Sequence, residues 1–590
     1  MSIAAATPPV APIRSRRAVL AAYLRPHRVG VGLLALILLA TIAVQVATPI
    51  VAARFIDRAT AAAPLDDLIR LAILTIVLAL AGQILAVSAT GMAERVGWDA
   101  TNALRIDLAT HLLRLDRTFH SAHTQGDLIE RVDGDVRTLA RFFSSFVVGL
   151  AGNALLLLAM LGVLWSVDWQ IGLALTGFTA IALITMLRIR TRATRDWAAD
   201  RQASADFYGF LGEYLAGLED VRSSGARAFV IRRSAMLMRA WLRTTTRAQL
   251  WSYTMIASSQ GIFTLGLAAA LGLAALRFHS GAISLGGVFL VFRLTDMLHG
   301  PTEQLRDEVQ DFQQADASLS RVQSLLAERP RILDGHTATL PPGRLDVVLD
   351  GVSFAYPDGK PVLQDVSITI PAGRKLGIVG RTGSGKTTLT TLIPRFHDPT
   401  AVVVRLGGVD IREVTLSGLR QRIGVVNQDV QILDASLRDN LTLFAPTTPE
   451  LDDRLRAILQ TLEFGDWLAH LPDGLDTRLG AGGIGLSAGQ MQVLSCARIL
   501  LHDPDIVILD EASSRLDPAS ERMLHRAFAV LLEDRTALIV AHRLATLALA
   551  DDILVLADGR VEEHGPRAML AADPDSRFAT LLRLDAEEIA

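Results

Sequence analysis

The sequence predicts an N-terminal all-α transmembrane domain with six spans and long cytoplasmic helical hairpins, followed by a C-terminal α/β domain. Three observations predict this architecture. Long uncharged runs fill the first half of the 590-residue chain, and short apolar runs alternate with polar turns in the second half. Arginine-rich segments separate the long runs. A short apolar run, residues 375–379, leads through a glycine-rich loop into a segment with helical character, residues 389–396.

Composition narrows the class of protein. The net charge of -3 gives no argument for nucleic-acid binding. Cys496 is the one cysteine, which excludes an intrachain disulfide, and we expect it to be a small buried residue. Lysine occurs at positions 360, 375 and 386, against many arginines, which is typical of a GC-rich bacterial genome. This scarcity makes Lys386 notable.

The first apolar run is a membrane span and not a signal peptide. Residues 1–28 are rich in alanine and proline and then basic, but residues 29–53 are too long for a signal h-region and lack a clear cleavage site. About 20 apolar residues cross a bilayer core. The sequence predicts a basic cytoplasmic segment at residues 1–28 and a transmembrane domain at 29–325, with spans at 29–53, 68–91, 143–166, 169–188, 251–276 and 283–303.

The arginines orient these spans. They are concentrated between spans two and three and between spans four and five, and the turn at residues 166–169 has none. The positive-inside rule therefore places both long segments, both termini and the second domain in the cytoplasm of a bacterial cell, beneath its inner (plasma) membrane. We expect each segment to form a helical hairpin, with tips near residues 118–128 and 207–215. Aromatic residues at 207, 208 and 210 either dock on a partner or pack between helices.

The sixth span carries charge inside the membrane. Arg293 and Asp296 stand one helical turn apart, with His299 nearby. Charges inside a span are costly and face a cavity or each other. Either the three residues contact an anionic or hydrogen-bonding cargo on a translocation pathway, or Arg293 and Asp296 only neutralise each other.

After a linker at residues 326–344, the pattern of residues 345–582 predicts strands at 345–354, 362–370 and 375–379. The loop that follows has the composition of a phosphate cradle, because glycine backbone N–H groups at a helix N-terminus bind anions. Lys386 would reach the β- and γ-phosphates, and Thr387 would hold Mg²⁺. The residues expected to bind nucleotide here are Gly380, Arg381, Thr382, Gly383, Ser384, Gly385, Lys386, Thr387 and Thr388.

Five further positions suit the same chemistry. Tyr356, after the first strand, suits stacking on adenine, or is a half-buried tyrosine at a strand end. Gln428 suits a place among the ligands around Mg²⁺. Asp510, at the end of an apolar run, suits a water-mediated contact to Mg²⁺. Glu511 would polarise the attacking water, and His542 would hydrogen-bond the γ-phosphate.

The decisive pattern is a second anion site about 100 residues after the first. Ser487, Ala488, Gly489 and Gln490 precede a helix predicted at residues 491–501. With this order of motifs, residues 345–580 resemble the nucleotide-binding domain of ABC transporters, including a D-loop at 514–517 with Asp517. The six-span half resembles the exporter-type transmembrane domain. The resemblance implies a half-transporter that hydrolyses ATP with Mg²⁺ and works as a dimer. In such a dimer, ATP lies between the phosphate loop of one chain and the signature of the other.

Three departures from the family pattern concern the partner. Ala488 stands where the family has glycine, residues 480–485 lack the usual glutamate, and Arg515 replaces a D-loop alanine. We expect this chain to be one member of an asymmetric heterodimer, the alternative being a homodimer with two mildly altered sites.

The expected cargo is a hydrophobic or amphipathic small molecule or a lipid, exported by alternating access. Alternatives are an exporter-fold importer, for example of a siderophore, and a non-transporting regulatory membrane ATPase.

Overall fold

The computed structural model describes residues 22–356, 359–399, 401–480, 482–510, 518–540 and 544–589, in two compact units. The first unit holds the described residues up to Arg114 and His123–Arg329. The second holds Leu115–Ala122 and the described residues from Pro330 onward. The short segment Leu115–Ala122 therefore packs with the second unit although it lies within the sequence of the first.

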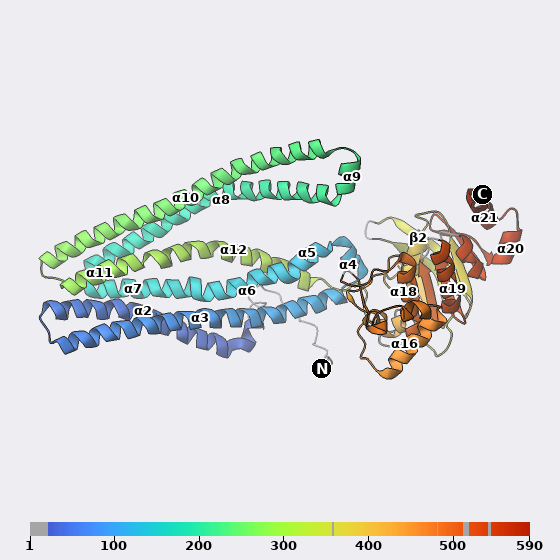
Figure 1. Ribbon diagram of the computed structural model, residues 1–590, viewed down its shortest axis with the longest axis horizontal. Helices are drawn as coiled ribbons and strands as arrows, with labels where there is room; N and C mark the ends of the chain where they lie inside the picture. The colour runs from blue at the N-terminus through green and yellow to red at the C-terminus, as the bar shows by residue number, and fades with distance from the viewer. Residues whose placement is uncertain are drawn as a thin grey trace. The chain divides into compact units, whose positions relative to one another are not determined.

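The first unit is a bundle of long helices (Figure 1). Helices α2 and α3 pack side by side, as do α8 and α10, whose far ends are joined by the short helix α9. The principal helices are α2 (Arg28–Thr60), α3 (Leu65–Arg114), α6 (Asp135–Ser145), α7 (Asn153–Val167), α8 (Trp169–Ala216), α9 (Leu218–Ser223), α10 (Arg227–His279), α11 (Leu285–Met297) and α12 (His299–Ala327).

Among the described residues, five helical segments are long and apolar enough to cross a membrane: Ala22–Thr60, Leu65–Arg114, Gly149–Val167, Trp169–Ala216 and Arg227–His279. They coincide with the first five predicted spans. The sixth predicted span falls on α11 and the first residues of α12, which are separated at Leu298. The third continues from α6 through a π-helical turn, Phe146–Gly152, into α7.

The position predicted for the second hairpin tip is wrong. Residues 207–215 lie inside α8, and the chain reverses at α9. Phe207 is buried and stacks on Trp241 of α10, with ring centroids 5.6 Å apart and planes at 29°. Tyr208 stays 59% exposed. Phe207 therefore packs between the two helices, because an apolar ring that faces the partner helix is removed from water there.

The second unit is built on two main sheets. A four-stranded antiparallel sheet has the order β2-β1-β4-β5, and a six-stranded mixed sheet has the order β12-β11-β3-β10-β9-β6. The strands are β1 (Val347–Ala355), β2 (Pro361–Ile370), β3 (Lys375–Val379), β4 (Ala401–Leu406), β5 (Val409–Asp410), β6 (Ile423–Val426), β9 (Ile506–Asp510), β10 (Thr536–Val540), β11 (Asp552–Ala557) and β12 (Arg560–Pro566); β7 (Ala435–Ser436) and β8 (Arg478–Leu479) form a separate pair.

Helices cover the larger sheet. Its central strands are buried on both faces, which explains their continuous Val/Ile/Leu composition. The helices of this unit are α13 (Lys386–Leu392), α14 (Leu416–Gln421), α15 (Leu437–Thr442), α16 (Pro449–Thr461), α17 (Gly465–Ala469), α18 (Ala488–His502), α19 (Pro518–Leu532), α20 (Arg567–Ala572) and α21 (Arg577–Ile589), besides α4 (Arg117–Ala122).

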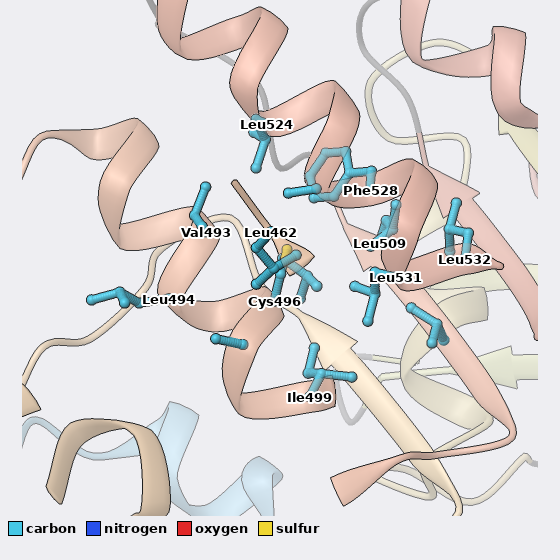
Figure 2. Packing of buried hydrophobic residues seen from close by; sticks show 14 of the residues in the cluster. Leu462, Val493, Leu494, Cys496, Ile499, Leu509, Leu524, Phe528, Leu531 and Leu532 are labelled. Carbon is cyan, nitrogen blue, oxygen red and sulfur yellow. The ribbon is translucent and has the colours of Figure 1, made fainter. Parts of the chain in front are cut away.

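Helices α18 and α19 pack against each other over β9 and share one apolar core (Figure 2). Cys496 of α18 lies within this core, beside Leu462 and among leucines of both helices. The thiol is fully buried, and burial raises its pKa to about 12, so it is inert at neutral pH. The prediction of a small buried residue is confirmed.

Two predicted helices differ at their ends. The helix after the glycine loop begins at Lys386 and ends at Leu392, earlier than the predicted 389–396, because Pro394 has no N–H and Arg395 adopts a positive φ of 55°. The helix predicted at 491–501 begins at Ala488. Ala488, Gly489 and Gln490 are therefore its first turn and not a loop before it.

Candidate functional site

The parallel strands of the larger sheet bring the candidate residues to one edge. Val540 of β10 pairs with Ile378 of β3 on one side and with Asp510 of β9 on the other. Val426 of β6 pairs with Leu509 of β9. The carboxyl ends of four adjacent strands therefore lie together, which is where α/β sheets bind ligands.

Each strand end leads into a predicted site residue. The phosphate loop follows β3, Gln428 follows β6, and Asp510 closes β9. Glu511 comes directly after β9 and His542 two residues after β10, but both lie outside the described residues, as do Asp517 and Arg515. The described ends of β9 and β10, Asp510 and Val540, pair at this edge.

The glycine loop can take its shape because it lacks side chains at its tightest points. Gly385 forms the N-cap of α13 with φ of +101°. A Cβ there would lie 2.7 Å from Leu363 Cδ2 and 3.0 Å from the Val362 carbonyl oxygen. On Gly380, a Cβ would lie 2.3 Å from the Leu556 carbonyl oxygen. Glycine is required at both positions, by close backbone approach and, at Gly385, also by backbone conformation.

The polar groups of the loop fit a phosphate. The Lys386 ammonium is buried and donates to the carbonyl oxygens of Gly380 at 2.7 Å and Arg381 at 3.1 Å. The Ser384 hydroxyl is buried with no hydrogen-bond partner in the described part of the chain. A buried hydroxyl without a partner is costly. A phosphate oxygen would satisfy it and would also attract the Lys386 charge.

Tyr356 is held at the end of β1 by three neighbours. Its hydroxyl is 3.2 Å from Thr388 Oγ1, in the first turn of α13. Its ring lies edge-on to Phe354, at 4.9 Å between centroids, and to His397, at 5.5 Å. The half-buried position given for this tyrosine is confirmed, and its hydroxyl contacts the helix that begins at the phosphate loop.

Sequence reasoning missed His397. This side chain is buried, and its Nδ1 lies 3.4 Å from the hydroxyl of Thr118, in α4. Beside it, the Arg117 guanidinium lies over the Phe396 ring, 5.9 Å from the centroid. Burial, and next the nearby Arg117 charge, lower the pKa of His397 below 6.5, so it is neutral at pH 7. A lone histidine after a helix carries no sequence signal for such a contact.

The second anion site is a helix N-terminus closed by a capping box. The Ser487 hydroxyl accepts from the Gln490 N–H at 3.2 Å, and Gln490 Oε1 accepts from the Ser487 N–H at 2.9 Å. Ser487 and Ala488 are exposed, whereas Gly489 is buried against α19, where a Cβ would lie 2.7 Å from Ser520 Cβ. The exposed face of this helix start presents the Ala488 methyl group.

A second residue that the sequence did not reveal is Gln492. It is buried on α18, and its Nε2 donates to the backbone oxygens of Gln428 at 2.8 Å and Asn427 at 3.3 Å. The helix that begins at the signature is thereby bonded to the loop that carries Gln428. The sequence signal for this contact is a glutamine on the apolar face of a predicted helix, because a buried amide needs hydrogen-bond partners.

In the first unit, Arg293 and Asp296 form an ion pair. The Arg293 Nη1 lies 2.7 Å from Asp296 Oδ2, and the two side chains are 49% and 51% exposed. His299 belongs to a different cluster. Its Nε2 lies 3.0 Å from Ser259 Oγ of α10 and 3.4 Å from Glu303 Oε1. The structure therefore shows Arg293 paired with Asp296 and gives His299 other partners.

Comparison with known proteins agrees with this geometry. Two family models match this chain. The model described as ABC transporter transmembrane region matches residues 31–300, and the model described as ABC transporter matches residues 363–514. This chain belongs to the ABC transporter family. Its first unit is the exporter-type helical transmembrane domain, and its second is the α/β nucleotide-binding domain.

Similar proteins extend the likeness over most of this ABC transporter. A protein of Staphylococcus aureus strain NCTC 8325 named as a multidrug export ATP-binding/permease protein is 31% identical over 478 residues, 80% of this chain and 81% of that protein. The protein of the same name in the bovine strain RF122 has the same identity and coverage. The structure of a bacterial Atm1-family ABC exporter with ATP bound superposes with a TM-score of 0.78 at 25% identity, covering 95% of this chain and 98% of that one.

These findings define the ABC transporter as a multi-pass membrane protein with an ATP-binding domain, whose ATP hydrolysis is coupled to transport. The transmembrane and ATP-binding regions are fused in one chain, as in a half-transporter.

Proposed function

We propose that this ABC transporter is one subunit of a dimer that exports a hydrophobic or amphipathic small molecule or a lipid by alternating access. The observation that carries the proposal is the common edge of β3, β10, β9 and β6, where the phosphate loop and Asp510 meet. One chain supplies the phosphate loop, and the Ser487 helix start of a second chain closes over the same ATP.

ATP hydrolysis at this edge needs positioned charge more than covalent chemistry. Lys386 stabilises the charge on the β- and γ-phosphates, and the Ser384 hydroxyl and the glycine N–H groups bind their oxygens. Glu511 orients the attacking water, and His542 hydrogen-bonds the γ-phosphate. Tyr356 stacks on the adenine.

The oxygen ligands for Mg²⁺ would be Thr387 and Gln428, with Asp510 holding the ion through a water molecule, because hydroxyl, amide and carboxylate oxygens suit this ion. Mg²⁺, when bound, neutralises charge on the phosphates. Gln492 holds the backbone of Gln428 and so keeps this amide at the sheet edge.

A Glu511→Gln variant tests the hydrolytic role. General-base catalysis contributes roughly 10²- to 10⁴-fold, and we expect ATPase activity to fall by at least about 10²-fold while ATP binding persists. The variant should accumulate as an ATP-bound dimer in size-exclusion chromatography. Unchanged turnover would overturn the role of Glu511.

The partner is proposed to be a second, different half-transporter. The Ala488 methyl group stands at the exposed helix start where a phosphate would approach, so the signature of this chain closes its site less tightly. Purified alone, the protein should have weak ATPase activity, and Ala488→Gly should raise the activity of the complete dimer. Robust cooperative ATPase activity of the wild-type protein alone would favour a homodimer.

The proposed pathway includes Arg293 and Asp296. Arg293 is eight residues beyond the start of α11, about 12 Å along the helix, so the half-exposed pair lies within the membrane. Exposure to lipid at that depth is costly, which favours a water-filled cavity or a partner surface. His299 and its partners Ser259 and Glu303 are a second polar patch of the same kind.

Transport assays separate the alternatives. In inside-out vesicles, ATP should drive the accumulation of an apolar dye, and Arg293→Ala should change the selectivity. Uptake in the opposite direction would indicate an importer, including one for siderophores. ATPase activity that no transported compound stimulates in proteoliposomes would indicate a regulatory membrane ATPase. The orientation with a cytoplasmic nucleotide-binding domain can be tested by protease accessibility in the same vesicles.

A further inference from the structure

A pocket of about 460 Å³ opens between α2 and α3 at the end of the bundle where one helix turns into the other. Its lining is almost entirely charged and consists of Arg54, Asp57, Arg58, Asp67, Arg70 and Leu71. None of these residues belongs to the nucleotide site or to the charged pair of α11.

The arginines of this pocket outnumber its carboxylates by three to two. Within the part of the chain that the structure describes, Arg54, Arg58 and Arg70 make no ion pair, whereas Arg277 at the same end of the bundle is paired with Asp168 at 2.6 Å. Three like charges around one small volume repel each other, and an anion relieves this repulsion.

One of the two carboxylates of the pocket, Asp57, also accepts hydrogen bonds from the start of α11. Asp57 Oδ2 accepts from the Ser284 hydroxyl at 2.8 Å, and Oδ1 accepts from the Gly286 N–H at 2.7 Å. Asp57 thereby caps the start of α11. A Cβ on Gly286 would lie 2.2 Å from the Ala53 carbonyl oxygen, so α2 and α11 are in direct contact beside Asp57. Asp57 keeps its negative charge, so two carboxylates face three guanidinium groups and the lining carries one net positive charge.

The pocket lies at the level of the membrane surface. Arg54 directly follows the apolar run of residues 29–53, and Arg70 lies in the first residues of the span predicted at 68–91, just before its uncharged run begins at Leu71. Charged groups at this level meet lipid headgroups. The connecting loop, residues 61–64, is on the side that the arginine bias assigns to the exterior, where arginine is disfavoured. A single surface arginine there needs no explanation, but three around one pocket do.

We propose that this pocket binds a phosphate group, carried either by the headgroup of a lipid or by a soluble phosphate ester. Guanidinium groups bind phosphate oxygens in bidentate pairs, which is a stronger and more directional contact than a lysine would make. This proposal goes beyond the proposed transport function and does not depend on it.

The test uses the full-length protein in detergent and measures retained lipid by native mass spectrometry. The probes are phosphatidylglycerol and, as a control with the same chains and no phosphate, diacylglycerol. We expect phosphatidylglycerol to be retained by the wild type and about tenfold less by Arg54→Ala/Arg58→Ala, because charge-assisted hydrogen bonds are lost. Diacylglycerol binding should be the same in both proteins. Competition by glycerol 3-phosphate would assign the site to soluble phosphate esters, and its absence to the lipid.

A matched pair of variants guards against a misfolded arginine variant. Asp66 and Asp67 are adjacent in the first turn of α3, but only Asp67 lines the pocket. Asp67→Asn should increase retention of phosphatidylglycerol, and Asp66→Asn should leave it unchanged. Arg239→Ala, an exposed arginine of α10, controls for loss of charge alone. Equal retention by wild type and the double arginine variant, or equal effects of the two asparagine variants, would overturn the proposal.

Discussion

The ring of Tyr356 lies edge-on against His397, with centroids 5.5 Å apart and planes at 84°. His397 in turn lies 3.4 Å from the hydroxyl of Thr118, in the short helix α4 that sequence order places among the membrane helices. The residue proposed to stack on adenine is therefore one side chain away from a segment continuous with the transmembrane domain.

This contact predicts a pH dependence. Burial and the neighbouring Arg117 lower the pKa of His397 below 6.5, while Asp116 opposes the shift, so the unfolded chain binds a proton more readily than the folded one. Its contribution to stability is fully present above about pH 6.5 and decreases as the pH falls toward the lowered value. Thermal unfolding of the wild type should show a lower Tm at pH 5.5 than at pH 7.5. A smaller difference is expected for His397→Phe, and an identical difference would contradict the assignment.

The phosphate loop allows a comparison of two glycines. Gly385→Ala should destabilise the domain by about 1–3 kcal/mol and abolish ATP binding, because the position combines φ of +101° with a clash against Leu363 and Val362. Gly383 has φ of +85° but nothing within 4 Å of a Cβ, so Gly383→Ala carries only the backbone cost. Titration with a fluorescent ATP analogue, together with Tm, measures both. Equal losses would show that the clash is unimportant.

Gln492 is predicted to position the loop of Gln428. Gln492→Met keeps the volume and removes the two donors, leaving backbone oxygens unsatisfied at a cost of about 1–3 kcal/mol. We expect a lower kcat for ATP with a smaller change in ATP affinity, because the proposed role of Gln428 is in the Mg²⁺ shell. Gln460→Met, on the exposed face of α16, is the matched control. A proportional loss of stability without a change in kcat would indicate a purely structural role.

The roles of two neighbouring aromatic residues of α8, the buried Phe207 and the exposed Tyr208, can be distinguished by substitution. Phe207→Ala should destabilise the α8–α10 hairpin by about 3 kcal/mol, since it removes a buried ring stacked on Trp241. Tyr208→Ala, at a position 59% exposed, should have little effect on stability. Limited proteolysis of the hairpin reports the first change. A loss of transport in Tyr208→Ala without a loss of protection would restore the hypothesis of a docking surface there.

Much of the fold could be predicted because its signals are local. Runs of about 20 apolar residues identify the spans, and short Val/Ile/Leu runs identify the buried parallel strands. The glycines of the phosphate loop are required by backbone conformation and close approach, which leave a mark in the sequence. The second hairpin tip was not predicted correctly, because α8 continues through Gly209 and Gly212 and ends only at Ala216. A glycine inside a helix costs too little to end it when the helix packs against a partner.

The sequence by itself determined the family, the order of the motifs and the chemistry of the phosphate loop, since these depend on residue type and spacing. Only the tertiary structure decided which distant side chains meet. His397 reaches Thr118, Gln492 holds the loop of Gln428, and Arg54, Arg58 and Arg70 surround one pocket. The first two contacts join residues 279 and 64 positions apart, and the third joins two different helices, so their energy comes from burial and hydrogen bonding that no local pattern encodes.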